Sequence, residues 1–220
     1  MSSDRPRDPA LTAWYQEYLD DQDSAAFASA VSKAYTSGTL QRLAEHDARE
    51  VRRAAVLALG FLGDYEVNHT MGRALHDEDR TVRILADNGI RSVWARCGNQ
   101  AQRQQLGIII RLNSAQQYKE AVGQATELIE KAPWFAEAWN QRAIARFGLG
   151  DYVQSIRDCH QALELNPYHF AAASGMGQAY LQLGNPVSAL ESFRRALRLN
   201  PGLDGVRAQV VRLTRMIEDK

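Results

Sequence analysis

"FAAASGMGQAYLQLGNPVSALESFRRALRLNPGL", residues 170–203, aligns without a gap on the 34 residues before it, "AEAWNQRAIARFGLGDYVQSIRDCHQALELNPYH", residues 136–169. In this alignment "GLGD" meets "QLGN", and "QALELNP" meets "RALRLNP". A further shift of the same length brings residues 102–135 into partial register. Two amphipathic helices of about fourteen residues cannot bury both apolar faces alone, so such a repeat predicts stacked helix pairs.

Apolar residues recur at i, i+3, i+4 and i+7 along most of the chain, and period-two alternation is never sustained. This pattern predicts an all-α protein, an α-solenoid of stacked helix pairs. Candidate N-caps agree with the predicted starts: Asp79 and Asn185 each precede an apolar-periodic run, and Asp47 with Glu50 forms a potential capping box.

The segment from about 102 to 220 resembles a tetratricopeptide repeat (TPR) array. The family pattern has Trp, Gly, Tyr, Ala, Phe, Ala and Pro at fixed columns, and residues 204–218 resemble the capping helix that ends such arrays. The matches are Ala121 and Pro133 in the first repeat, Trp139, Ala162 and Pro167 in the second, and Gly177, Tyr180, Ala189, Phe193, Ala196 and Pro201 in the third.

A second period, of 31 residues, relates Val51–Arg52 to Val82–Arg83. A short helix, an acidic turn, "VR" and an Ala/Leu-rich helix resemble HEAT-like repeats, here at 37–64 and 65–97, behind two further helices in 10–36. The letters LGDY occur at 62–65 and at 149–152, a separation that is a multiple of neither period. We therefore expect one shared type of turn, in which Gly is left-handed and Asp caps the next helix.

Length and charge bound the partners. The chain has 220 residues and equal numbers of basic and acidic side chains, which favours neither nucleic acid nor an anionic membrane as partner. We expect a disordered segment at 1–9, N-terminal helices with HEAT-like repeats at 10–100, and a TPR domain with its capping helix at 101–220. The charged N-terminus does not resemble a secretory leader, so we expect a cytoplasmic protein.

No catalytic motif stands out, so we expect no enzyme and no cofactor or metal. HEAT-repeat enzymes of the deoxyhypusine hydroxylase kind bind iron through His-Glu pairs, but His46 and His76 precede acidic turns and favour a turn role. Cys159 occupies a TPR column usually filled by Phe and is expected in the core. An alternative remains, because the "VRRAAVLALG" stretch also resembles repeats of phycobilin lyases, which hold a tetrapyrrole.

The TPR resemblance implies a concave groove lined by the first helix of each pair, and exposed apolar side chains on such a face indicate binding. The chain's own residues 1–15 are a competing occupant of this groove. TPR domains that clamp acidic chaperone tails use Lys, Arg and Asn at positions held here by Leu106, Ile110, Gln141, Ala171 and Gly175, so no such clamp is expected. The residues expected to bind a protein or peptide partner are Asn140, Ile144, Phe147, Ser174, Gln178 and Leu181.

Overall fold

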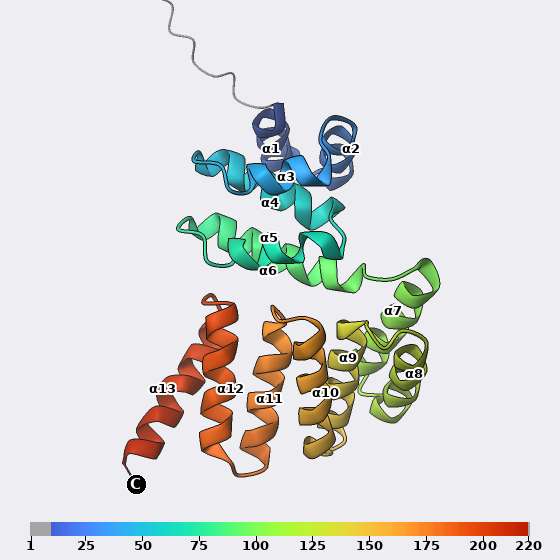
Figure 1. Cartoon of the computed structure of the whole chain (residues 1–220), viewed down its shortest axis with the longest axis vertical. Coiled ribbons are helices and arrows are strands. Elements are labelled where there is room, and N and C mark those ends of the chain that lie inside the picture. Colours follow the sequence, from blue (N-terminus) through green and yellow to red (C-terminus); the bar gives the residue numbers. More distant parts are fainter. Residues whose placement is uncertain (1–9, 220) are drawn as a thin grey trace, which may run out of the picture. The chain divides into compact units, whose positions relative to one another are not determined.

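The computed structural model describes residues 10–219 and divides them into two compact units, one ending at Val93 and one beginning at Trp94. The described residues form thirteen α-helices and one 3₁₀ helix, with no strand among them, so the all-α prediction is confirmed (Figure 1). The expected disordered segment, 1–9, lies outside the described range. None of the helices within that range combines the length and the apolar character needed to cross a bilayer.

The first unit begins with two helices that pack on α4 and continues with the two predicted HEAT-like repeats (Figure 1). Its elements are α1 (Ala10–Asp21), α2 (Ser24–Ala34), α3 (Ser37–Leu43), α4 (Arg49–Leu62), η1 (Tyr65–Val67), α5 (Asn68–Ala74) and α6 (Arg80–Ala95).

The 31-residue period returns in the side-chain hydrogen bonds. Arg52 and Arg83 each donate from Nη1 to the carbonyl oxygens five and six positions before them, over distances of 2.8–3.0 Å. In both repeats the arginine thus holds the turn that leads into its own helix. The "VR" pair therefore marks a turn-fastening arginine, because the guanidinium satisfies carbonyls that the turn leaves without backbone partners.

Two of the three predicted caps form. Asp79 Oδ1 accepts the N–H three residues later at the start of α6, at 3.0 Å, and Asn185 does the same at 3.0 Å for α12. The prediction for Asp47 is wrong, because α4 begins one residue later than that cap requires and has Ala48 as its N-cap, without a side-chain bond. The backbone carbonyl of Asp47, rather than its carboxylate, is used, since it accepts from Arg52.

The two LGDY turns differ in the conformation of their glycines. Gly150 has φ +80°, as expected, whereas Gly63 has φ −70°, so the left-handed prediction is wrong there. Gly63 is needed for space instead, because a Cβ at that position would lie 2.5 Å from Val67 Cγ2. The aspartates behave alike, since Asp64 and Asp151 both accept a backbone N–H of the helix that follows.

The second unit stacks three helix pairs and one final helix side by side (Figure 1). The first helices of successive pairs contact one another, α7 with α9 and α9 with α11, and α13 packs on α12 as the predicted capping helix. The elements are α7 (Gln100–Ser114), α8 (Tyr118–Lys131), α9 (Ala136–Gly148), α10 (Tyr152–Leu165), α11 (Phe170–Gln182), α12 (Pro186–Leu199) and α13 (Asp204–Glu218).

The 34-residue period extends to the backbone of the turns within each pair. Gln116, Gly150 and Gly184 are spaced at that interval and all have positive φ, at 58°, 80° and 69°. The N–H that follows each of them bonds a carbonyl five residues back at 2.9 Å. The α7–α8 pair therefore turns as the next two pairs do, although its sequence matches the TPR pattern least.

Buried ions join neighbouring helices of the second unit. Asp158 on α10 is 2% exposed and accepts two bonds from Arg142 on α9, each at 2.9 Å. Arg146 adds a third contact at 2.9 Å, and Arg142 also reaches Thr126 on α8. Since the buried carboxylate is fully paired, this network ties α8, α9 and α10 together.

Candidate functional site

A cavity of about 180 Å³ opens between α9, α10 and α11. It is lined by one stripe of side chains from each first helix and by two residues of the intervening second helix, which is how a concave TPR groove is built. The lining residues are Asn140, Ala143, Ile144, Phe147, Ser155, Cys159, Ala171, Gly175 and Gln178.

Four of the six predicted site residues line this cavity, namely Asn140, Ile144, Phe147 and Gln178. Ile144 is 44% exposed, and Phe147 is half-buried. Ser174 and Leu181 are not among the lining residues. Ser174 is half-buried on α11, and Leu181 packs instead against the apolar cluster shared by α12 and α13.

The floor of the cavity consists of small residues that the groove pattern did not select: Ala143, Ser155, Cys159 and Gly175. Ser155 donates to the carbonyl of Ala143 at 2.8 Å and so needs no ligand. Burial, aided by the charge of Asp158, raises the pKa of Cys159 to about 12, so the thiol stays protonated. Cys159 therefore contributes an apolar, unreactive surface, in agreement with its expected place in the core.

Two amide side chains border the cavity with unused hydrogen-bonding capacity. Asn140 is 5% exposed and donates from Nδ2 to Glu137 Oε1 at 3.1 Å, while its own carbonyl oxygen accepts no bond within residues 10–219. The amide of Gln178 makes no hydrogen bond to any described residue. Both groups are therefore available to the backbone of a bound peptide.

A buried Glu137–His169 pair sits beside Asn140. His169 Nδ1 accepts the N–H of Ala172 at 3.2 Å, so the ring proton is on Nε2, which donates to Glu137 at 2.9 Å. Burial by itself raises the pKa of Glu137, but the hydrogen bonds from His169, Gln141 and Asn140 outweigh it and leave the pKa below its usual value. The pair is thus a neutral imidazole against a carboxylate, which places negative charge beside the cavity.

The positions that would form an acidic-tail clamp carry no cation. Leu106 is 1% exposed and belongs to the core, and Ile110 packs against the same cluster. The Gln141 side chain donates to Glu137 and accepts from Asn113. The remaining two positions are an alanine and a glycine of the cavity lining.

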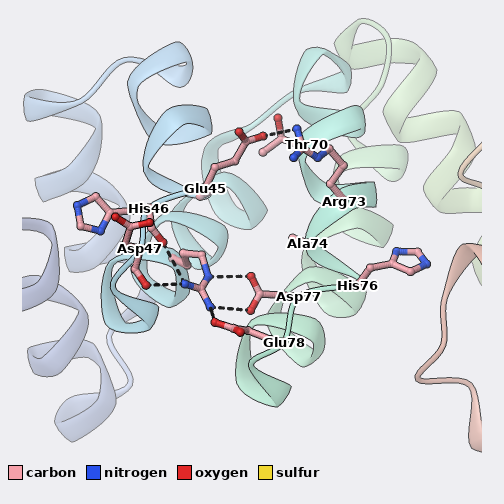
Figure 2. Close-up of a pocket in the computed structure, with 11 residues that line it drawn as sticks. Glu45, His46, Asp47, Thr70, Arg73, Ala74, His76, Asp77 and Glu78 are labelled. Carbon is pink, nitrogen blue, oxygen red and sulfur yellow. Dashed lines mark hydrogen bonds and ion pairs between the residues drawn. The ribbon is translucent and has the colours of Figure 1, made fainter.

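The first unit contains a larger and more polar pocket of about 370 Å³, between the turns that precede α4 and α6 (Figure 2). Its centre is the guanidinium of Arg52, which bonds both carboxylate oxygens of Asp77, one of Glu78, and the carbonyls of His46 and Asp47. These five bonds use all five N–H groups of the arginine. Because no donor is left over, the arrangement is a fastening between the two repeats rather than a ligand-binding centre.

His46 and His76 lie in exposed turns, as predicted, and Figure 2 shows their rings on opposite sides of this pocket. His46 Nδ1 accepts the N–H of Ala48 at 3.0 Å, which gives it a turn-capping role. Among the residues that the structure describes, no three His, Cys, Asp or Glu side chains gather in a way that could hold a metal ion. The alternative role of this unit in handling a tetrapyrrole stays a prediction.

Two family models match the chain. One, described as tetratricopeptide repeat, covers residues 134–201, and one, described as HEAT repeats, covers residues 36–127. The HEAT match continues through α7 and into α8, where the 34-residue period already holds in the backbone.

Among curated proteins, a TPR repeat-containing protein of Rhizobium etli is 44% identical over 50 residues, 23% of this chain. The match spans about a quarter of that relative, 24% of its length. Among solved structures, the first TPR of Spaghetti (RPAP3) bound to the HSP90 peptide SRMEEVD superposes with a TM-score of 0.52 at 21% identity, over 55% of this chain and 96% of that one. The first TPR domain of human RPAP3 gives 0.51 at 21% identity, over 54% and 93%. These likenesses establish the fold of the second unit.

Proposed function

Because this chain carries HEAT repeats followed by tetratricopeptide repeats, we propose that it is a non-enzymatic scaffold that binds a partner peptide or protein in its TPR groove. The observation that carries the proposal is the cavity between α9, α10 and α11, which combines apolar walls with unused amides at its edge. An exposed apolar surface of this kind favours association, and the amides suit a peptide backbone.

The expected binding mode is apolar burial with backbone hydrogen bonds. No side chain that lines the cavity is charged, and the nearby Asp158 is paired with two arginines. Association should therefore depend weakly on ionic strength, unlike encounters steered by charge.

A protein of similar fold binds an acidic HSP90 peptide, but this chain is proposed not to bind one. The clamp positions supply no cation, and the Glu137 carboxylate lies beside the cavity. A carboxylate brought into this surrounding would lose hydration without gaining a partner charge.

The test is affinity purification with the 220-residue chain as bait, compared with the variants Ile144→Asp and Phe147→Asp. A partner that binds in the groove should be lost from both, because each variant places a charge on an apolar wall. Val187→Asp is the matched control, since Val187 is 56% exposed on α12 and lies outside the cavity lining. Equal recovery of every partner by all folded variants would rule out the groove as the binding site.

A further inference from the structure

Helix α11 contains two interior glycines, Gly175 and Gly177, and packing accounts for only one of them. A Cβ at Gly177 would lie 2.6 Å from the ring of Phe193, so a side chain there is excluded. At Gly175 the nearest atom to such a Cβ is Cys159 Sγ at 3.6 Å, an ordinary van der Waals contact. Alanine would therefore fit at Gly175, and it would favour the helix more than glycine does.

The position of Gly175 suggests what this weakening of the helix achieves. Gly175 and Cys159 both line the floor of the cavity between α9, α10 and α11, and the built Cβ points toward that sulfur. A larger side chain at this position would enter the cavity between the walls formed by Ile144 and Phe147. The missing side chain thus preserves the depth of the cavity.

The size and charge of the cavity define what can enter it. An apolar protein cavity of about 150 Å³ is large enough to hold benzene, and the cavity here is about 180 Å³. One branched aliphatic or phenyl side chain therefore fits, and two do not. The surface complements an uncharged group, because none of its lining side chains carries a charge and the Asp158 carboxylate beneath the floor is neutralised by Arg142 and Arg146.

We propose that Gly175 keeps this cavity open as a socket for one uncharged apolar side chain, of leucine to phenylalanine size, on the bound peptide. The inference rests on the proposed function of the groove and specifies the chemistry of its ligand. The Asn140 carbonyl and the Gln178 amide flank the socket, so the peptide groups on either side of the anchor side chain meet them.

The probe is a set of N-acetylated, C-amidated hexapeptide pools with uncharged, randomised flanks and one fixed residue, which is Leu, Phe, Glu or Gly. Binding to the 220-residue protein is measured by isothermal titration calorimetry. The Leu and Phe pools should bind about tenfold or more tighter than the Gly and Glu pools, since burial of one such side chain accounts for that ratio. No preference for Leu or Phe over Gly would overturn the socket.

The variants separate the socket from the groove as a whole. Gly175→Leu should lose the preference for the Leu and Phe pools while keeping its helical circular dichroism. Gly175→Ala should melt at or above the parental temperature, whereas the matched Gly177→Ala should melt several degrees lower. If Gly175→Ala melts as low as Gly177→Ala, the glycine is structural and the inference is wrong. If Gly175→Leu binds like the parent while Phe147→Asp does not, the groove binds peptides but the socket does not exist.

Discussion

Truncation of Trp139 should destabilise the second unit more than any other single aromatic change in its turns. The ring is half-buried and packs against two apolar clusters, one around α7 and α8 and one around α10 and α11. Its Nε1 donates to the carbonyl of Pro133 at 2.9 Å, and the guanidinium of Arg142 lies 4.8 Å from the ring centre. Trp139→Ala removes all three interactions at the boundary between two repeats.

The magnitude follows from these contacts. Replacing a buried Trp or Phe with Ala costs about 3–5 kcal/mol, and partial exposure places Trp139 at the lower end, about 3 kcal/mol. A domain with a total stability of about 5–15 kcal/mol would lose a large share of it. At about 2–4 °C per kcal/mol for a chain of this size, the melting temperature should fall by about 6–12 °C.

The assay is urea and thermal unfolding followed by circular dichroism at the helical band. Trp134→Ala is the matched control, because Trp134 is 50% exposed and stacks only on its neighbour Phe135, so its loss should stay below about 1 kcal/mol. Trp139→Phe keeps a ring but loses the hydrogen bond and should fall between the two. A Trp139→Ala protein no less stable than the Trp134→Ala protein would show that the repeats are not joined through this residue.

Four further outcomes are expected. The hydrogen bond from Arg53 holds the pKa of Asp79 well below its usual range, so its contribution is present above pH of about 4 and is lost as the pH falls toward the folded-state pKa. Asp79→Asn, which keeps the cap, should lower stability at neutral pH by about 1–2 kcal/mol, and unfolding curves of parent and variant should converge in acid. Gln116→Gly should raise stability by about 0.5–1 kcal/mol in urea unfolding, because Gln116 is left-handed, whereas loss of stability would refute strain there. Deletion of 204–220 uncovers the apolar side of α12 around Phe193 and should cause aggregation in size-exclusion chromatography; a soluble monomer of unchanged helicity would contradict this role of α13. The peptide SRMEEVD should show no micromolar binding in fluorescence anisotropy at any salt concentration, and measurable binding that salt competes away would disprove the absence of a clamp.

Much of the architecture could be predicted from sequence because it is locally encoded. Apolar periodicity of 3.6 residues, caps such as Asn185 and repeat spacings of 31 and 34 residues each act within one helix or one turn. The capping helix α13 was predictable for the same reason, since the last pair of any stack has one uncovered apolar side.

Local rules failed where space rather than propensity decides. Gly63 and Gly150 share their flanking letters, yet only Gly150 is left-handed, because Val67 crowds the first turn and no equivalent contact crowds the second. Asp47 and Asp79 both precede acidic turns, but only Asp79 caps its helix.

The candidate site was half predictable. The groove columns identified the walls and the amide edge, because those residues repeat along the first helices. They could not show that α13 draws Leu181 away from the groove, that Ser155 and Cys159 of a second helix form the floor, or that Glu137 meets His169 from 32 positions away. Periodicity along one helix states which face a residue occupies, whereas the depth, charge and contents of a cavity depend on which helices meet there, and only tertiary packing decides that.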